Sequence, residues 1–202
     1  MIYAAGRWLC AIFCRLFFRL RVNGREHIPK KGAFIIAGNH VSFLDPVVFG
    51  VACSRQLNYL ARDTLFRNKL FRWLLKAVHV IPLKRNAADI GALKEALRRL
   101  KAGQGLLLFP EGTRSTDGRL GPGHHGVGFL ARKSGVPVVP VYSKGAEIAM
   151  PKGSRSIKPA HIRVVFGMPI DFSKYPEISD QGIADEIMKQ LQALKDQPAL
   201  FY

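Results

Sequence analysis

The sequence predicts a single α/β domain built on a largely parallel, mixed sheet that is flanked by helices. Unbroken apolar runs, typical of buried strands, alternate along the chain with segments whose apolar residues recur at helical spacing. Turns rich in glycine and proline separate these segments. With 202 residues, of which 48% are hydrophobic, the chain is long enough to bury one sizeable core.

The individual elements follow from these runs. Apolar runs predict strands over 33–37, 57–61, 78–83, 105–109, 137–142 and 161–166. Amphipathic patterns predict helices over 47–52, 66–77, 87–101 and 127–133, and a last helix striped by Ile183, Ile187, Leu191 and Leu194. Residues 22–31 are polar and turn-like. Pro137 and Pro140 cannot donate a ladder hydrogen bond, so their strand is predicted at a sheet edge or a strand end.

The first 21 residues are strongly apolar and aromatic, but four arginines interrupt them: Arg7, Arg15, Arg19 and Arg21. On a helix these arginines fall on one side, and the uninterrupted apolar run is too short to span a bilayer. We therefore expect residues 1–22 to form an amphipathic helix in the membrane interface, ahead of a domain over residues 23–202. The alternative is a helix that packs on the domain's own core.

The charge of the chain predicts an anionic partner. Lysine and arginine number 31 against 14 acidic residues, which gives a net charge of +17. Nucleic acid, anionic lipid and a phosphorylated or acidic carrier substrate all satisfy that charge. A nucleic-acid-binding protein would interleave basic residues with exposed aromatics, whereas here the aromatics concentrate near the amino terminus beside an apolar face. We therefore expect a membrane surface with anionic lipid as a partner, and no nucleic acid.

A histidine and a carboxylate, His40 and Asp45, stand where the first predicted strand ends and a helix begins. They can meet only if His40 lies on the turn and Asp45 at the helix start, because on one continuous helix they would point about 140° apart. In that arrangement His40 accepts a proton from a hydroxyl while Asp45 orients the ring. The alternative is that Asp45 only caps the helix, or that Ser42 caps it with Asp45 as its capping-box partner.

A second polar turn, Glu111-Gly112-Thr113-Arg114, follows the strand predicted over 105–109. Glycine lets the backbone approach a ligand, Thr113 offers a hydroxyl, and the Arg114 guanidinium matches phosphate oxygens two at a time. The alternative is a surface turn with an internal ion pair between Glu111 and Arg114.

Taken together, four stretches resemble the motifs of the glycerolipid acyltransferase family, specifically the bacterial 1-acyl-glycerol-3-phosphate acyltransferases. In order, they are Asn39-His40-x-x-x-x-Asp45, Ile81-Pro82-Leu83-Lys84-Arg85, Phe109 to Ser115, and Val136 to Val141. The resemblance implies transfer of a fatty acyl group from acyl-coenzyme A or acyl-carrier protein to the free hydroxyl of 1-acyl-glycerol 3-phosphate (lysophosphatidic acid), giving phosphatidic acid. Acceptance of another lysolipid or of glycerol 3-phosphate is the alternative.

The resemblance also implies roles for individual residues. His40 is the general base and Asp45 its orienting partner. The acceptor phosphate is expected on Arg114, with Glu111, Gly112 and Thr113 in the same motif and Arg85 ending the second one. Because a thioester is already activated, direct attack needs no acyl-enzyme, although Ser42 is a conceivable nucleophile.

The chain departs from the family pattern after Pro122, where relatives carry a lysine that helps to neutralise the phosphate. Here the residues are Gly123-His124-His125-Gly126, so His124 and His125 are possible acceptor contacts and the acceptor's head group stays open. No cofactor is expected, and no metal, because nothing near Cys10 and Cys14 completes a metal site. The protein is expected at the cytoplasmic face of the cell membrane, peripheral or monotopic.

Overall fold

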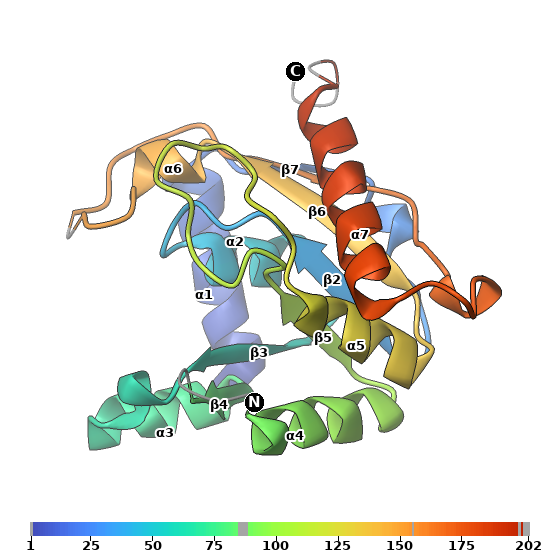
Figure 1. Ribbon diagram of the computed structural model, residues 1–202. Coiled ribbons are helices and arrows are strands. Elements are labelled where there is room, and N and C mark those ends of the chain that lie inside the picture. The colour runs from blue at the N-terminus through green and yellow to red at the C-terminus, as the bar shows by residue number, and fades with distance from the viewer. Residues whose placement is uncertain (1, 85–88, 155, 198, 200–202) are drawn as a thin grey trace.

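The computed structural model describes the whole chain except Met1, residues 85–88, 155, 198 and 200–202. Its centre is a seven-stranded sheet of order β1-β7-β6-β2-β5-β3-β4 (Figure 1). The strands are β1 (Arg21–Asn23), β2 (Phe34–Gly38), β3 (Leu57–Arg62), β4 (Val80–Leu83), β5 (Gly105–Leu108), β6 (Val138–Lys144) and β7 (Arg163–Phe166). All neighbours are parallel except β6 and β7. The predicted α/β fold with a largely parallel sheet is therefore confirmed.

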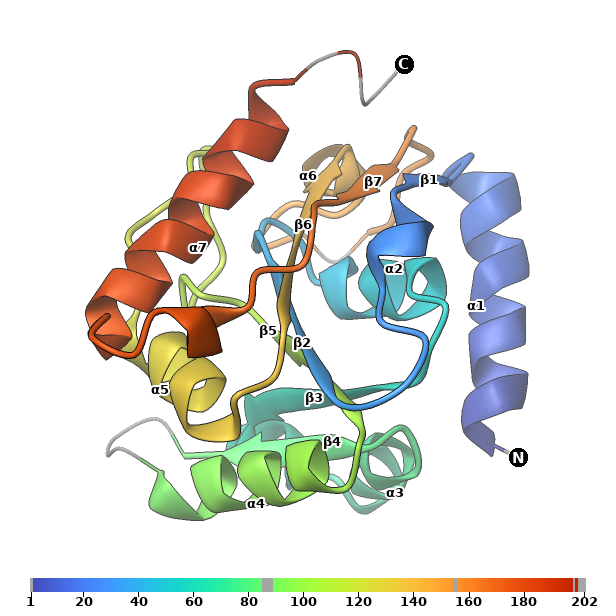
Figure 2. The same cartoon turned by 90° about the vertical axis from the view of Figure 1, so that its right-hand side faces the viewer.

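Helices cover both faces of this sheet (Figure 2). One core lies under α1 (Ile2–Phe17), α2 (Asp45–Ala52) and the short α6 (Ala146–Ala149). The other lies under α4 (Ile90–Lys101), α5 (His125–Ser134) and α7 (Asp180–Lys195). The predicted stripe of α7 is buried in the second core, where Ile183, Ile187 and Leu191 are fully covered.

Two expectations about strands are wrong. Residues 22–31 were expected to be turns, but Val22 lies in β1, which pairs with β7 across a long sequence separation that a local pattern does not reveal. The strand with the prolines, β6, lies inside the sheet, so the predicted edge position is wrong, whereas Pro137 directly precedes the first residue of the strand, as the strand-end alternative expected. Pro140 is tolerated because it faces β7 where that strand ends: its carbonyl accepts from Gly167 N at 2.8 Å, just beyond Phe166.

Helix α1 packs on the domain's own core, as one of the two alternatives expected, and its docking in a membrane interface stays a prediction. One side packs on the domain through buried Cys14 and Phe18, and Arg7 donates to carbonyl oxygens of Gly50 and Cys53 at the end of α2. Its outer side exposes large apolar side chains: Trp8, Leu9, Ile12, Phe13 and Leu16. Strand β1 spans the boundary placed between residues 22 and 23, so a division into two parts stays a prediction.

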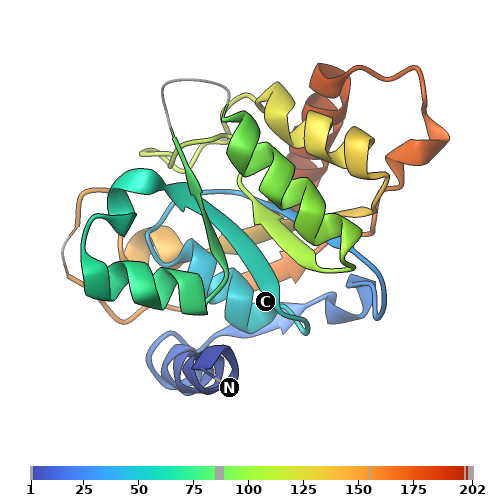
Figure 3. The ribbon, with the colours of Figure 1, turned by 90° about the horizontal axis from the view of Figure 1, so that it is seen from below.

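Helix α3 (Lys69–Ala77) lies beyond the β3–β4 end of the sheet (Figure 3). It begins later than the predicted residue 66, because residues 63–66 form a 3-10 turn and the Asn68 side chain caps the helix by accepting from Phe71 N. No residue of α3 is buried. The predicted helix therefore forms, but the domain does not bury its apolar side.

Candidate active site

The carboxyl ends of the parallel strands bring the predicted polar turns together. β2 lies between β5 and β6, and β5 between β2 and β3. The turn with His40 follows β2, the turn with Glu111 follows β5, and Arg62 ends β3. Since these strands run in the same direction, all three positions lie at one edge of the sheet, where open α/β folds bind ligands.

Asp45 is the first residue of α2, with Pro46 behind it, as the spacing predicted. Its carboxylate is fully buried, and Oδ2 accepts three hydrogen bonds, from His40 Nδ1 at 2.8 Å and from the backbone N–H groups of Val41 and Ser42 at 2.7 Å each. The N-cap residue of α2 is Leu44 and no side chain caps the helix, so the alternative that Asp45 only caps the helix is wrong. The oxygen that holds the His40 ring instead fixes the turn before the helix.

His40 is held on every side. Its ring stacks on that of Phe109, with centroids 3.9 Å apart, and its side chain is 17% exposed. Its backbone N–H donates to Glu111 Oε1 at 3.1 Å, and its carbonyl accepts from Ser115 N at 2.7 Å. Because the Asp45 carboxylate accepts a hydrogen bond from Nδ1–H, Nε2 is the nitrogen that can accept a proton from a substrate hydroxyl.

Glu111 connects two loops rather than pairing with Arg114. Its side chain is buried, with Oε1 on His40 N and Oε2 accepting from Gly121 N at 3.0 Å. Among the described residues no ion pair joins Glu111 to Arg114, so that alternative is wrong. The carboxylate instead holds the turn of His40 against the loop that follows Ser115.

Arg114 lies close to this turn, with its guanidinium carbon 3.3 Å from the centre of the Phe43 ring. Burial, and secondarily the positive charge of Arg62, lower the pKa of Arg114. Its Nη1 is buried and finds no hydrogen-bond acceptor among the described residues. A buried donor without an acceptor is costly, and two neighbouring guanidinium groups repel, so the pair suits a bound anion.

The remaining predicted residues lie at different depths. Gly112 has a left-handed backbone with φ of 62°, and a Cβ there would come within 2.9 Å of the His124 ring, so His124 lies against the turn formed by residues 111–114. Thr113 and His125 are exposed, and His125 begins α5. Arg85 lies outside the residues that the structure describes.

Three residues of this edge were not assigned a role from the sequence: Asn39, Arg62 and Phe109. The buried Asn39 side chain exchanges two hydrogen bonds with the backbone of Ser143, which ties the end of β2 to β6. A polar residue directly after a buried strand was the available signal for Asn39. Phe109 and Arg62 gave none, since an aromatic residue and an exposed basic residue at a strand end are common.

The described residues contain neither a metal site nor a membrane-spanning helix. No group of histidine, cysteine, aspartate and glutamate side chains there has the arrangement of a metal site. Within the same part of the chain, no helix has both the length and the apolar character needed to cross a membrane.

The chain belongs to the acyltransferase family, whose model matches residues 19–144. It is 33% identical over 170 residues to the chloroplastic 1-acyl-sn-glycerol-3-phosphate acyltransferase BAT2 of Brassica napus, covering 82% of this chain and 49% of that one. The 1-acyl-sn-glycerol-3-phosphate acyltransferase of Bacillus subtilis is 27% identical over 189 residues, covering 90% of this chain and 92% of that one. The chain thus spans about half of the plant relative and nearly all of the bacterial one.

The fold is also similar to a solved structure of this family. The crystal structure of the 1-acyl-sn-glycerophosphate acyltransferase PlsC from Thermotoga maritima superposes with a TM-score of 0.80 at 26% identity. The match covers 96% of this chain and 82% of the Thermotoga chain.

Proposed function

We propose that this protein transfers a fatty acyl group from acyl-coenzyme A or acyl-carrier protein to the free hydroxyl of 1-acyl-glycerol 3-phosphate. The product is phosphatidic acid, a precursor of phospholipids. The observation that carries the proposal is the His40–Asp45 pair, set beside an arginine whose buried Nη1 has no acceptor among the described residues. The names of the plant, Bacillus and Thermotoga relatives support the same substrate class.

The chemistry needs one proton acceptor and no covalent enzyme intermediate. His40 Nε2 takes the proton of the acceptor hydroxyl as its oxygen attacks the thioester carbonyl, and Asp45 stabilises the resulting imidazolium. The tetrahedral intermediate collapses with cleavage of the carbon–sulfur bond, and the imidazolium returns the proton to the leaving thiolate. Ser42 is an unsuitable nucleophile, because its hydroxyl donates to Met150 O at 2.7 Å and accepts from Leu44 N.

We assign the acceptor phosphate to Arg114, with Arg62 as a second cation. The charge of Arg62 lowers the pKa of Arg114, and no ion pair joins Arg114 to a carboxylate among the described residues, so a doubly charged phosphate monoester would relieve the repulsion of the two guanidinium groups. Glu111 acts by ordering the two loops, while Gly112 lets the backbone come close to the ligand. His124, which lies against Gly112, is the residue through which the head group can differ, so another lysolipid or glycerol 3-phosphate is the alternative acceptor.

The lipid substrate and the net charge of +17 support work at an anionic membrane surface, with α1 as the docking helix. We place this surface at the cytoplasmic face of the cell membrane, where acyl thioesters are available, with the protein peripheral or monotopic.

The decisive experiment is an acyl-transfer assay of the purified protein with both donors. The acceptors are lysophosphatidic acid, lysophosphatidylcholine and glycerol 3-phosphate. We expect product only with a phosphate monoester acceptor, and His40→Ala should lower the rate by about 10²–10⁴ while the circular dichroism spectrum stays unchanged. Equal use of lysophosphatidylcholine would contradict the phosphate assignment. A rate for His40→Ala within about tenfold of wild type would contradict general-base catalysis.

A further inference from the structure

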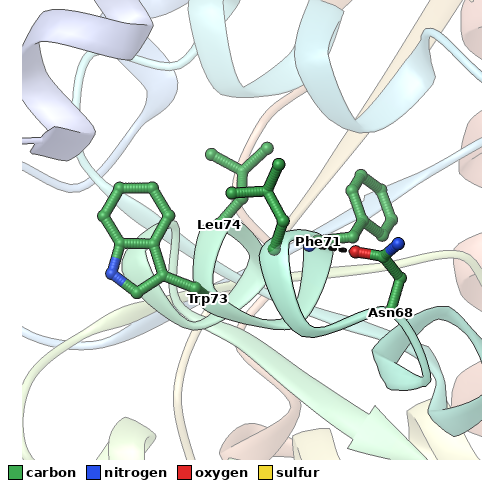
Figure 4. Close-up of a pocket in the computed structure, with 5 residues that line it drawn as sticks. Asn68, Phe71, Trp73 and Leu74 are labelled. Carbon is green, nitrogen blue, oxygen red and sulfur yellow. Dashed lines mark hydrogen bonds between the residues drawn. The ribbon is translucent and has the colours of Figure 1, made fainter.

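Helix α3 has an apolar side with no partner in the described chain. Leu70 is 75% exposed, Trp73 56%, and Phe71 and Leu74 42% each. At 100° per residue these four side chains occupy an arc of about 160° on one side of the helix. Together with Asn68 they line an open groove, and Figure 4 shows Trp73, Leu74 and Phe71 projecting outward from the ribbon. In a globular protein the core normally covers the apolar side of an amphipathic helix, so the uncovered side of α3 is available for a partner.

The charge around this arc selects the chemistry of the partner. Residues 64–84 contain no aspartate or glutamate, and Arg67, Lys69, Arg72 and Lys76 are all exposed. On the helix wheel Lys69, Arg72 and Lys76 lie opposite the apolar arc, at about 200–260° from Leu70. A second copy of this chain, with its charge of +17, would be repelled there. An anionic partner is favoured.

From this arrangement we propose that α3 is a second membrane-docking element, which inserts its apolar arc into the interface of an anionic bilayer. Trp and Phe beside leucines, with basic residues on the other side, are the composition of helices that lie in that interface. The Asn68 cap holds the helix formed before contact. The inference goes beyond the acyl-transfer proposal, because its test measures binding and not turnover.

The position of α3 relative to α1 supports the same partner. His79, two residues after α3, packs edge to face on Tyr3 of α1 with ring centroids 5.8 Å apart. The amino-terminal end of α1 therefore meets the carboxyl-terminal end of α3, and the two helices run in different directions from this contact (Figure 1). Both helices expose aromatic and aliphatic side chains, so the surface of one bilayer can contact both helices.

The chain contains two tryptophans, Trp8 in α1 and Trp73 in α3, so each helix can be given a single reporter. In Trp8→Phe, the Trp73 emission should shift to the blue on addition of phosphatidylglycerol vesicles and be quenched by bromine-labelled acyl chains. The shift should be weaker with phosphatidylcholine vesicles, and salt should reduce it. If Trp73 emission stays unchanged while Trp8 in Trp73→Phe shifts, α1 alone docks and the proposal is overturned.

A second measurement tests the arc itself. Leu70→Ser combined with Leu74→Ser should weaken binding to phosphatidylglycerol vesicles by at least about tenfold, because two exposed leucines lose their burial in lipid. Ile90→Ser is the matched control, since Ile90 is 62% exposed on α4 and lies outside the arc. Equal losses in the double variant and the control would overturn the proposal. So would a Trp73 shift with an acidic acyl-carrier protein but not with vesicles, which would make the arc a protein-binding site.

Discussion

The carboxyl edge of the sheet and the outer sides of α1 and α3 invert the ordinary rule of burial in opposite ways. At the sheet edge, charged and polar side chains are buried: Asp45 is fully covered and Glu111 is 5% exposed. On the two helices, large apolar side chains are exposed, with Leu16 at 76% and Leu70 at 75%. Both arrangements cost folding free energy relative to the usual one, so each marks a region whose sequence serves something other than stability.

The two regions offset that cost differently. At the sheet edge most of the buried carboxylate oxygens are satisfied internally: Asp45 Oδ2 accepts three hydrogen bonds and both oxygens of Glu111 accept backbone N–H groups. Asp45 Oδ1 finds no hydrogen-bond partner among the described residues. Helix α3 has no such internal compensation, because none of its residues is buried, and the exposed apolar side chains of α1 lie outside the part of that helix that packs on the domain. A catalytic geometry must be rigid before the substrate arrives, whereas a docking surface completes its contacts only on its partner. The difference between the regions thus follows from what each must do.

The largest effect should come from removing the charge of Asp45 at the carboxyl edge of the sheet. Asp45→Asn keeps the side-chain shape but replaces the carboxylate with a neutral amide. The amide oxygen is a weaker acceptor for the three hydrogen bonds from His40 Nδ1 and the two backbone N–H groups. We expect the acyl-transfer rate to fall by about 10² or more and the free energy of unfolding to fall by about 1–3 kcal/mol. Assays and urea titration measure the two effects. A stable variant with full activity would show that the bonds to Asp45 do not set the position of His40.

Glu111→Gln should have the next largest effect, because the amide NH₂ would face one of the two backbone N–H groups that the carboxylate now accepts. We expect a lower kcat with little change in KM for the donor, since Glu111 acts through the turn of His40. Glu147→Gln is the matched control: Glu147 also accepts a backbone N–H, that of Gly145 at 2.8 Å, but in α6. The assignment is refuted if both variants lose kcat equally.

The sequence predicted the carboxyl edge of the sheet better than the exposed sides of α1 and α3. His40, Asp45 and Glu111 follow strand ends, and strand ends can be read from apolar runs, so parallel strands brought them to one edge. The role of Glu111 could not be read, because its partners, His40 N and Gly121 N, depend on loop geometry. The apolar arc of α3 was visible as a pattern, but periodicity says only that a helix has an apolar side, not whether the core covers it. The interior placement of β6 was missed for a similar reason, since sheet order depends on long-range pairing.

Arg7 joins the two regions and should have an intermediate effect. It lies on α1 and donates to Gly50 O and Cys53 O at the end of α2, the helix that begins with Asp45. Arg7→Gln should lower the free energy of unfolding by about 1–3 kcal/mol, because charged hydrogen bonds to helix-terminal carbonyls are lost. Arg15→Gln removes the same charge from an exposed position on α1 and should cost much less. Urea titration of the two variants measures the difference, and similar midpoints would show that Arg7 does not hold α1 on the domain.

The smallest effect concerns Glu95, which supports the end of the sheet where α3 lies. Hydrogen bonds from Arg98 and then Arg99 lower the pKa of Glu95 from 4.5 to about 2. Arg99 continues to Asn58 Oδ1 at 2.6 Å and to His79 O at 2.8 Å, so this carboxylate steadies a cation that connects α4 with β3 and the turn after α3. Because the pKa is lower in the folded chain, the ionised form stabilises the fold above about pH 4.5, and this contribution disappears as the pH falls toward 2.

Glu95→Gln should therefore lower the melting temperature slightly at pH 7, and the difference from wild type should shrink between pH 4.5 and 2. Arg98→Gln is the control: it removes the more exposed partner, at 70%, and leaves Arg99 in place, so its effect should be smaller still. A difference between Glu95→Gln and wild type that stays constant over that pH range would show that the charge of Glu95 does not support this end of the sheet.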